Sequence, residues 1–283
     1  QRGYNGLING EVYEMNVRSV SEIIHRGGTI LYTARCLEFK TQEGQAKGLA
    51  RCKELGIDAL VVIGGDGSFM GARARANQGI PCIGLPGTID NDIACSEYTI
   101  GYDTAMNTAV EAIDKLRDTT QSHDRCSVVE VMGHHAGYIA LNVGIATGAV
   151  AVLLPEIPFD FERDILQRMR QTQVTGKKHF IIIVSEGVIG AQELANQIQA
   201  ATGVDSRATV LGHIQRGGSP TVRDRVNASL MGYHAIDLLD KGIYNRVVAV
   251  SGDKIVDYDV NVALSMHKTI DRDMIEIANA ISI

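Results

Sequence analysis

Apolar residues are grouped along the chain in continuous runs separated by amphipathic stretches. The apolar runs cover residues 58–65, 81–87, 126–133, 149–156, 179–187 and 245–252. Continuously apolar runs of this length are typical of parallel strands that are covered on both faces. The stretches between them repeat apolar residues at helical spacing, at 43–56, 104–118, 161–171 and 222–242. This order predicts an α/β protein built from two doubly wound, Rossmann-like lobes with mostly parallel sheets.

Four polar segments begin where an apolar run ends. They are GGDGS (64–68), GTIDND (87–92), MGHHAG (132–137) and SEG (185–187). In doubly wound sheets, ligands bind in the crevice beyond the carboxyl ends of the strands. The sequence therefore predicts that these four segments line one crevice.

Length, charge and cysteine content narrow the class of protein. The chain has 283 residues, which favours two lobes over one, and a net charge of −6, which does not favour nucleic acid or an anionic membrane as a partner. No apolar run is long enough to cross a bilayer, and no signal-peptide pattern opens the chain. The five cysteines are scattered without a C-x-x-C pair, which argues against structural zinc and favours a reducing compartment, the cytoplasm.

The GGDGSFMG segment (64–71) has the features of a phosphate-binding loop. Glycines let the backbone approach a ligand closely, and N–H groups at a helix start bind phosphate. Asp66 lies between two glycines, where it can reach a metal ion that neutralises phosphates. The alternative is a tight strand-to-helix turn with glycine for steric reasons. The motif is not unique, because diacylglycerol and nicotinamide-dinucleotide kinases also have GGDG loops.

The PGTIDND segment (86–92) places Thr88, Asp90 and Asp92 at alternating positions. Residues two apart in an extended backbone point the same way, so these three side chains should share a side and Asn91 should face the other. A polar turn is the alternative. Beside a nucleotide loop, Asp90 can accept the proton of an incoming hydroxyl, Thr88 can donate to the transferred phosphoryl group, and Asp92 can orient the metal or the surroundings of Asp90.

A third segment, RATVLGHIQRGGSP (207–220), concentrates basic residues in an acidic protein. Arg207, His213 and Arg216 predict a cradle for a phosphate dianion, with a solvated basic loop as the alternative. Arg125 precedes a predicted strand and Glu186 follows one. Both are candidates to complete a sugar-phosphate site, with Glu186 binding hydroxyl groups.

Together, these motifs closely resemble those of bacterial ATP-dependent 6-phosphofructokinases. The matching segments, in order, are GGDGS, PGTIDND, TIGYDTA, RDT with SH, VVEVMG and RATVLGHIQRGGSP. The resemblance runs from residue 2 to about residue 242 and is weaker beyond. It implies a phosphofructokinase-like fold, a homotetramer, and transfer of the γ-phosphoryl group of MgATP to the 1-hydroxyl of fructose 6-phosphate in glycolysis.

The resemblance also implies a role for individual residues. It makes Asp90 the catalytic base, flanked by Thr88 and Asp92, and Asp66 the Mg²⁺ ligand. The implied ATP contacts are Arg35, Cys36, Gly65, Asp66, Gly67 and Ser68. The implied fructose 6-phosphate contacts are Thr88, Ile89, Asp90, Arg125, Met132, Gly133, His134, Glu186, Arg207, His213 and Arg216. In the family, the arginines at positions 125 and 207 reach across from a neighbouring subunit.

The resemblance further implies how the lobes are assembled. An ATP-binding lobe is expected from residues 1–101 plus 215–265, and a fructose 6-phosphate-binding lobe from 102–214 plus 266–283. The family also has a first strand and a GGDxPG loop that these 283 residues do not contain. We expect that unit to precede the present first residue, because a sheet without its first strand exposes an apolar edge.

The choice of cosubstrate follows from two glycines. Pyrophosphate-using relatives carry Asp at the position of Gly67 and Lys at that of Gly87, whereas glycine leaves space for the ATP α-phosphate. ATP is therefore favoured. The alternatives are a pyrophosphate-dependent or other sugar-phosphate kinase of the same fold, and a non-catalytic regulatory paralogue that binds sugar phosphate.

Two departures from the family pattern carry expectations of their own. His134 stands where the family has Arg, so we expect weaker fructose 6-phosphate binding and activity that falls as pH rises. At the effector site, Arg117 and Lys177 match basic positions, but Val17, Val150 and Thr175 replace charged residues. We therefore expect blunted control by ADP and phosphoenolpyruvate.

Overall fold

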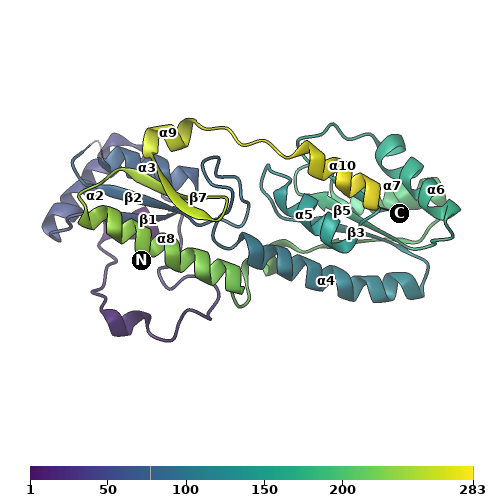
Figure 1. The fold of residues 1–283 in the computed structure, drawn as a ribbon, viewed down its shortest axis with the longest axis horizontal. Coiled ribbons are helices and arrows are strands. Elements are labelled where there is room, and N and C mark those ends of the chain that lie inside the picture. The colour runs from purple at the N-terminus through teal and green to yellow at the C-terminus, as the bar shows by residue number, and fades with distance from the viewer. Residues whose placement is uncertain (77, 283) are drawn as a thin grey trace. The chain divides into compact units, whose positions relative to one another are not determined.

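The computed structural model describes residues 1–76 and 78–282 and shows an α/β chain with two compact units (Figure 1). Unit 1 comprises Gln1–Thr88, Ile93–Gly101 and Gly218–Lys268. Unit 2 comprises Ile89–Asp92, Tyr102–Gly217 and Thr269–Ile283. Each unit has its own sheet, so the predicted fold class is confirmed.

Unit 1 contains a four-stranded sheet in the order β1-β2-β7-β8. The strands are β1 (Leu60–Gly64), β2 (Cys82–Pro86), β7 (Arg246–Ser251) and β8 (Lys254–Asp259), and β8 alone runs antiparallel to its neighbour. The first three were predicted from their apolar runs. Gly64 pairs with Pro86, so the carboxyl ends of β1 and β2 lie side by side.

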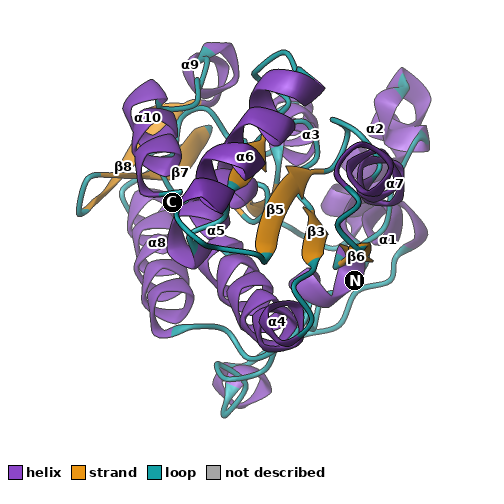
Figure 2. Cartoon of the chain, turned by 90° about the vertical axis from the view of Figure 1, so that its right-hand side faces the viewer, coloured by secondary structure: helices purple, strands orange, loops and turns teal. Residues whose placement is uncertain are grey.

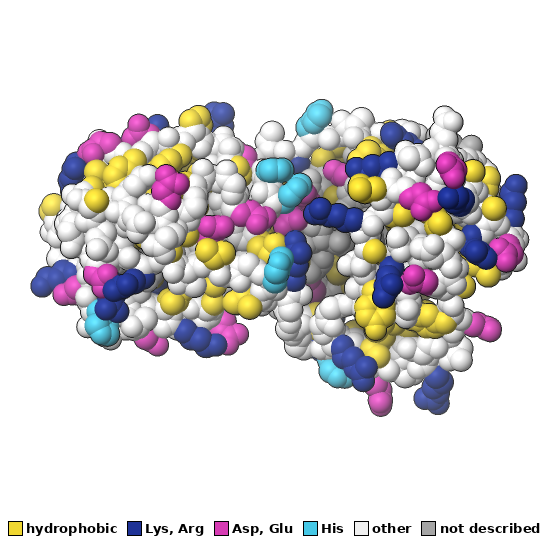
Figure 3. Space-filling view, turned by 180° about the vertical axis from the view of Figure 1, so that it is seen from behind, with side chains coloured by type: hydrophobic (Ala, Val, Ile, Leu, Met, Phe, Trp, Pro, Cys, Tyr) yellow, Lys and Arg dark blue, Asp and Glu magenta, His cyan; other side chains and the backbone are white. Residues whose placement is uncertain are grey.

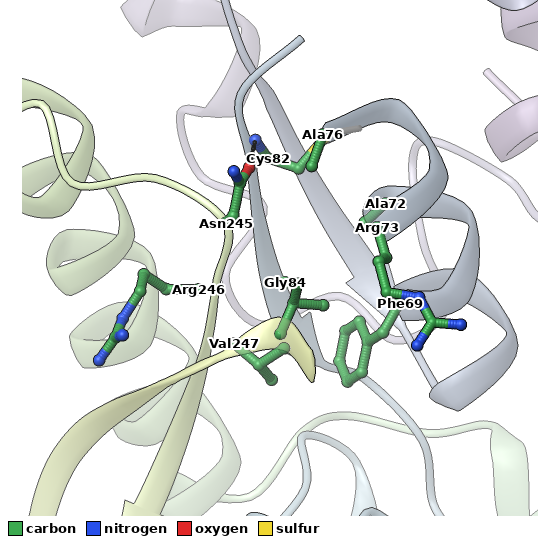
Figure 4. Close-up of a pocket in the computed structure, with 10 residues that line it drawn as sticks. Phe69, Ala72, Arg73, Ala76, Cys82, Gly84, Asn245, Arg246 and Val247 are labelled. Atoms are coloured by element: carbon green, nitrogen blue, oxygen red, sulfur yellow. Dashed lines mark hydrogen bonds between the residues drawn. The ribbon is translucent and has the colours of Figure 1, made fainter. Parts of the chain in front are cut away.

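The helices of unit 1 pack around this sheet. They are α1 (Gly3–Asn9), α2 (Gln42–Glu54), α3 (Asp66–Ala76), α8 (Val222–Asp240) and α9 (Val260–Ser265), with 3-10 turns η1 (Val17–Val20) and η2 (Glu38–Lys40). Figure 4 shows Phe69 of α3 beside Gly84 and Val247 of the sheet. A Cβ atom on Gly84 would lie 2.8 Å from the Phe69 ring, so glycine is required for this close packing.

Strand β1 forms an edge of the sheet in the described residues, and part of its apolar surface is exposed. The exposed fractions of Val61 and Ile63 are 39% and 56%. A parallel sheet normally buries such residues on both faces. The exposed apolar edge expected from the sequence is therefore present.

Unit 2 contains a fully parallel sheet in the order β4-β5-β3-β6. Its strands are β3 (Cys126–Val131), β4 (Ala151–Leu153), β5 (Phe180–Ser185) and β6 (Ser206–Val210). Its helices are α4 (Tyr102–Ser122), α5 (Tyr138–Thr147), a π-turn η3 (Glu162–Leu166), α6 (Gln167–Val174), α7 (Ala191–Thr202), a 3-10 turn η4 (Gly212–Arg216) and α10 (Arg272–Ile281). Figure 2 shows β5 and β3 with helices on both sides.

Charged side chains of both signs occur on the surface of the protein (Figure 3). On the face in Figure 3, Lys and Arg side chains are interspersed with Asp and Glu and form no continuous basic surface. None of the helices in the described part of the chain is both long enough and apolar enough to span a bilayer.

Candidate active site

The GGDGS segment forms the predicted connection between a strand and a helix in unit 1. Gly64 ends β1, and α3 begins at Asp66, whose side chain is exposed. The Gly65 carbonyl accepts hydrogen bonds from the N–H groups of Ser68 (2.8 Å) and Phe69 (3.1 Å), so the helix starts directly on the loop. A Cβ atom on Gly64 would lie 2.3 Å from Ser68 Oγ. Glycine is thus needed for the chain to turn this tightly.

A residue that the sequence reasoning missed supports this loop. The Tyr4 hydroxyl donates a hydrogen bond of 2.6 Å to the Ser68 carbonyl, and its ring stacks on Phe39 with 4.0 Å between centroids. Burial raises the pKa of Tyr4, so the hydroxyl stays protonated and acts as a donor. The only signal was the position of Tyr4 in the RGYNGL motif, which does not reveal its partner.

Arg35 and Cys36 lie in an irregular stretch of unit 1, where Arg35 is exposed and Cys36 is half-buried. The resemblance placed them after an early strand, but the first strand in the described residues starts at Leu60. That part of the prediction is wrong for the described chain. Their role as ATP contacts stays a prediction.

The PGTIDND segment starts beside the GGDGS loop. The Gly87 N–H donates to the Gly64 carbonyl (3.0 Å), which fixes the two strand ends together in unit 1. A Cβ atom on Gly87 would lie 2.8 Å from Ile63 Cγ2, so the Ile63 side chain would have to move for a larger residue here. The Thr88 carbonyl accepts a hydrogen bond from Thr99 Oγ1 (2.6 Å). Thr88 is the last residue of this part of unit 1, and Ile89–Asp92 belong to unit 2.

The alternation expected around Asn91 is present in the burial of the side chains. Asn91 is only 4% exposed, whereas Asp90 and Asp92 are half-buried. Asn91 has φ 53°, a left-handed conformation that Asn tolerates better than most residues, so the chain turns here and is not extended as the prediction assumed. That Thr88, Asp90 and Asp92 share a side stays a prediction.

The carboxyl ends of β3 and β5 bring four predicted sugar-phosphate residues together in unit 2. The N–H groups of Gly133 and His134 both donate to Glu186 Oε1, at 3.2 and 2.5 Å. His134 has φ 59°, and its Nδ1 lies 3.8 Å from Asp92 Oδ2. One oxygen of Glu186 therefore positions the loop that starts at Met132, a role that the sequence reasoning did not foresee.

Turn η4 carries two predicted cations and a buried anchor. His213 and Arg216 are exposed and three residues apart, and side chains at this spacing eclipse in a 3-10 helix, so they share a side. Between them, Gln215 is 1% exposed, and its Oε1 accepts the Met132 N–H at 2.8 Å. This link between η4 and the end of β3 was also missed, because an uncharged Gln gives no local signal.

Arg125 and Arg207 lie at the other end of the strands of the same sheet, the amino-terminal end. Arg125 precedes β3 and Arg207 lies near the start of β6, which pairs with β3 in parallel. Both guanidinium groups bind Asp205, Arg125 through a 2.6 Å hydrogen bond and Arg207 through a 3.1 Å ion pair. These contacts, led by the Arg125 hydrogen bond, hold the pKa of Asp205 below its usual value.

Strand length separates Arg207 from the other two basic residues of its motif. Strand β6 has five residues, so its two ends lie roughly 13–16 Å apart. The cradle of Arg207, His213 and Arg216, predicted from their closeness in sequence, is therefore not formed within one chain. Parallel pairing puts Arg207 at the amino-terminal edge and the others at the carboxyl edge.

Comparison with known proteins decides the family. Residues 1–239 match the family model described as Phosphofructokinase. The chain belongs to the phosphofructokinase family. It is 53% identical to ATP-dependent 6-phosphofructokinase 1 of Clostridium perfringens over 282 residues, which cover 100% of this chain and 88% of the relative. It is 52% identical over the same span and coverage to ATP-dependent 6-phosphofructokinase of Clostridium botulinum.

Solved structures of phosphofructokinases share the fold. The Saccharomyces cerevisiae enzyme matches with a TM-score of 0.90 and 30% identity, over 99% of this chain but 44% of that longer chain. A pyrophosphate-dependent phosphofructokinase from Marinobacter aquaeolei matches with a TM-score of 0.83 and 22% identity, over 99% of this chain and 81% of that chain. At that identity the second likeness shows the fold alone.

The residues matched to the family's effector site form a basic group at the amino-terminal edge of β5. The Arg117 guanidinium donates to the Thr147 carbonyl. Burial, followed by the nearby charge of Arg117, lowers the pKa of Lys177, and burial with both of these cations lowers the pKa of His179. Val150 is buried, and Thr175 Oγ1 donates to the Thr172 carbonyl.

The residues present suit Mg²⁺ bound together with a nucleotide. Mg²⁺ is usually held by one or two carboxylates plus substrate phosphates and water. Asp66 offers one exposed carboxylate in the first turn of α3, next to backbone N–H groups that suit phosphate. No cluster of three or more His, Cys, Asp or Glu residues with metal-binding geometry occurs among residues 1–76 and 78–282.

Proposed function

We propose that this family member transfers the γ-phosphoryl group of MgATP to the 1-hydroxyl of fructose 6-phosphate, with Asp90 as the general base. The observation that carries the proposal is the turn at Asn91. Asn91 is left-handed and buried, and Asp90 and Asp92 on either side of it are half-buried, a few residues after Pro86 ends β2. The 52–53% identical relatives are named ATP-dependent 6-phosphofructokinases, which supports ATP as the cosubstrate.

Asp90 takes the proton of the sugar hydroxyl as that oxygen attacks the phosphoryl group. Phosphoryl transfer needs little covalent chemistry from the protein, so orientation and charge neutralisation supply most of the rate. Thr88 donates a hydrogen bond to the transferred group, and Asp92 keeps the surroundings of Asp90 in place. The 3.8 Å approach of His134 to Asp92 links the Asp90 turn to the sugar-binding loop within unit 2.

The nucleotide binds at the start of α3. Gly65, Gly67 and the Ser68 side chain contact the phosphates at the start of the helix, where the positive end of the helix dipole favours anions. The Ser68 N–H is already used in the hydrogen bond to the Gly65 carbonyl. Asp66 holds Mg²⁺, which neutralises the charge of the phosphates when it is bound. Arg35 and Cys36 are the further ATP contacts.

The sugar phosphate binds at the carboxyl edge of the unit 2 sheet, through Met132, Gly133, His134, Glu186, His213 and Arg216. Arg125 and Arg207 lie at the other edge, so we assign them to the sugar phosphate of a neighbouring copy in a homotetramer. The enzyme then needs its oligomer for a complete site. Its place in glycolysis implies a cytoplasmic enzyme.

Replacing Asp90 tests the proposal. In the native full-length enzyme, Asp90→Ser is expected to lower kcat about 10²- to 10⁴-fold, the usual contribution of a general base, while the KM for ATP changes little. The matched control is Asp240→Asn, an exposed carboxylate in α8. An Asp90→Ser enzyme that turns over as fast as its parent would refute the proposed chemistry.

A further inference from the structure

Unit 2 contains a cavity of about 340 Å³ that none of the residues discussed so far lines. It lies between the carboxyl end of β4, the loop that follows and α10. Most of its wall is apolar, with Leu153, Ile157, Phe159 and Ile275 among the contributors. The volume and the apolar lining are within the range of sites that bind small molecules.

Two arginines and one carboxylate provide the charge in this cavity. Arg163 binds Asp164 through two parallel hydrogen bonds, Nε to Oδ1 at 2.6 Å and Nη2 to Oδ2 at 2.8 Å. This fork-to-carboxylate geometry satisfies both groups. Asp164 is therefore already neutralised by its neighbour in sequence.

Arg168 has no such partner. Its guanidinium donates only to neutral groups, Asn279 Oδ1 at 2.7 Å and Ser282 Oγ at 3.4 Å. Among the described residues it forms no ion pair within 4.0 Å, although it is half-buried at the cavity wall. Burial lowers the pKa of Arg168, and the nearby charge of Asp164 offsets this only in part. The two arginines and one carboxylate leave the cavity with one net positive charge.

We propose that this cavity binds a small amphipathic carboxylate, with its apolar body against the wall and its carboxylate on Arg168. A guanidinium fork matches a carboxylate in shape, and pairing would compensate the half-buried charge. A monoanion fits the single uncompensated cation. A phosphate dianion without an apolar body would leave the wall uncovered and half its own charge unpaired.

A tryptophan reporter measures the binding directly. The chain has no Trp, so Phe159→Trp gives a fluorescence signal from the cavity alone. We expect sodium octanoate to change that fluorescence in a saturable way, and calorimetry on the unsubstituted protein to give the same affinity. If neither method detects saturable binding up to the solubility of octanoate, the proposal is wrong.

Matched variants test the role of Arg168. In the reporter background, Arg168→Met should weaken octanoate binding at least about tenfold, because a charge-assisted hydrogen bond is lost. Arg168→Lys should restore part of the affinity. The control is Arg170→Met on the same helix, since Arg170 is exposed and pairs with Glu162. Equal affinities in the Arg168→Met and Arg170→Met proteins, both folded by circular dichroism, would overturn the assignment.

Two further probes separate the apolar and charged parts of the ligand. 1-Octanol has the same apolar body without charge, and inorganic phosphate has charge without an apolar body. Both should bind at least about tenfold more weakly than octanoate. Octanol binding as tightly as octanoate would exclude the role of the carboxylate, and phosphate binding as tightly would exclude that of the apolar wall.

Discussion

His134 is the residue at which the site departs from the family pattern. Its N–H is held by Glu186, and its ring lies between Asp92 and His135, with 4.4 Å between the two histidine ring centroids. An arginine at this position would offer a planar fork of N–H donors that matches a phosphate, and a histidine ring lacks this fork. If this loop binds the sugar phosphate, fewer hydrogen bonds to it are therefore available here than in the family.

We predict that His134→Arg lowers the KM for fructose 6-phosphate. Because a guanidinium fork can form two charge-assisted hydrogen bonds to a phosphate, the KM should fall about tenfold at pH 7.5 while kcat changes less. The measurement is steady-state kinetics at that pH. His135→Arg, a change of the same kind at the next residue, serves as control. Equal KM values for the parent and His134→Arg would contradict the prediction.

We also predict that Gly67 determines the choice of phosphoryl donor. A Cβ atom there would meet nothing within 4 Å, and an acidic residue suits the first turn of a helix, so Gly67→Asp should fold normally. The new carboxylate would face the ATP phosphates, and like charges in contact cost several kcal/mol. We expect kcat/KM for ATP to fall at least about 100-fold. The control is Gly232→Asp on α8, where a Cβ atom would also meet nothing within 4 Å. If kcat/KM for ATP is unchanged in Gly67→Asp, Gly67 does not select the nucleotide.

At the scale of elements, one carboxylate joins three parts of unit 1. Asp257 of β8 accepts hydrogen bonds from Arg246 of β7 at 2.5 Å and from His234 of α8 at 2.7 Å. Burial alone would raise the pKa of Asp257, but the hydrogen bonds from His234 and Arg246 outweigh it and hold the pKa below its ordinary value of 3.8. A lowered pKa means that the folded state favours the ionised carboxylate.

We predict that Asp257→Asn lowers the free energy of unfolding by about 1–3 kcal/mol at pH 7. The parent should lose this advantage as pH falls below about 4, because its own Asp257 then becomes protonated. Urea unfolding at pH 7 and pH 3.5 measures both effects. The control is Asp253→Asn, which changes an exposed carboxylate in the adjoining turn. If the parent and Asp257→Asn differ in stability as much at pH 3.5 as at pH 7, the assignment is wrong.

The elements also show what the sequence predicts and what it does not. Continuous apolar runs predicted β1, β3 and β5, and the alternation around Asn91 was visible in one heptapeptide. Strands β6 and β8 were missed because they lie at sheet edges and mix polar with apolar residues. Partners distant in sequence were missed as well. Gln215 and Met132 are 83 positions apart and Glu186 and Gly133 are 53 apart, and only the folded sheet brings each pair together.

At the scale of the whole molecule, residues at the two ends of the unit 2 strands support the proposal that each active site is shared between two subunits. Asp90 belongs to unit 2, as do Gly133 and Glu186 at the carboxyl ends of its strands. Arg125 and Arg207 lie a strand length away, where both bind Asp205. If both arginines bind sugar phosphate, they bind it on another copy. A subunit without Asp90 can then still supply arginines, and one without arginines can still supply the base.

This arrangement predicts that two inactive enzymes can restore each other. Asp90→Ser and the double variant Arg125→Ala, Arg207→Ala are each expected to be nearly inactive. When they are dissociated, mixed and reassembled, some interfaces pair an intact Asp90 with intact arginines, so activity should rise well above the sum of the two parents. Native mass spectrometry identifies the mixed oligomers, and reassembly of each parent alone is the control. Mixed oligomers without recovered activity would mean that each chain completes its own site, because no combination of these subunits would then hold both functional groups in one place.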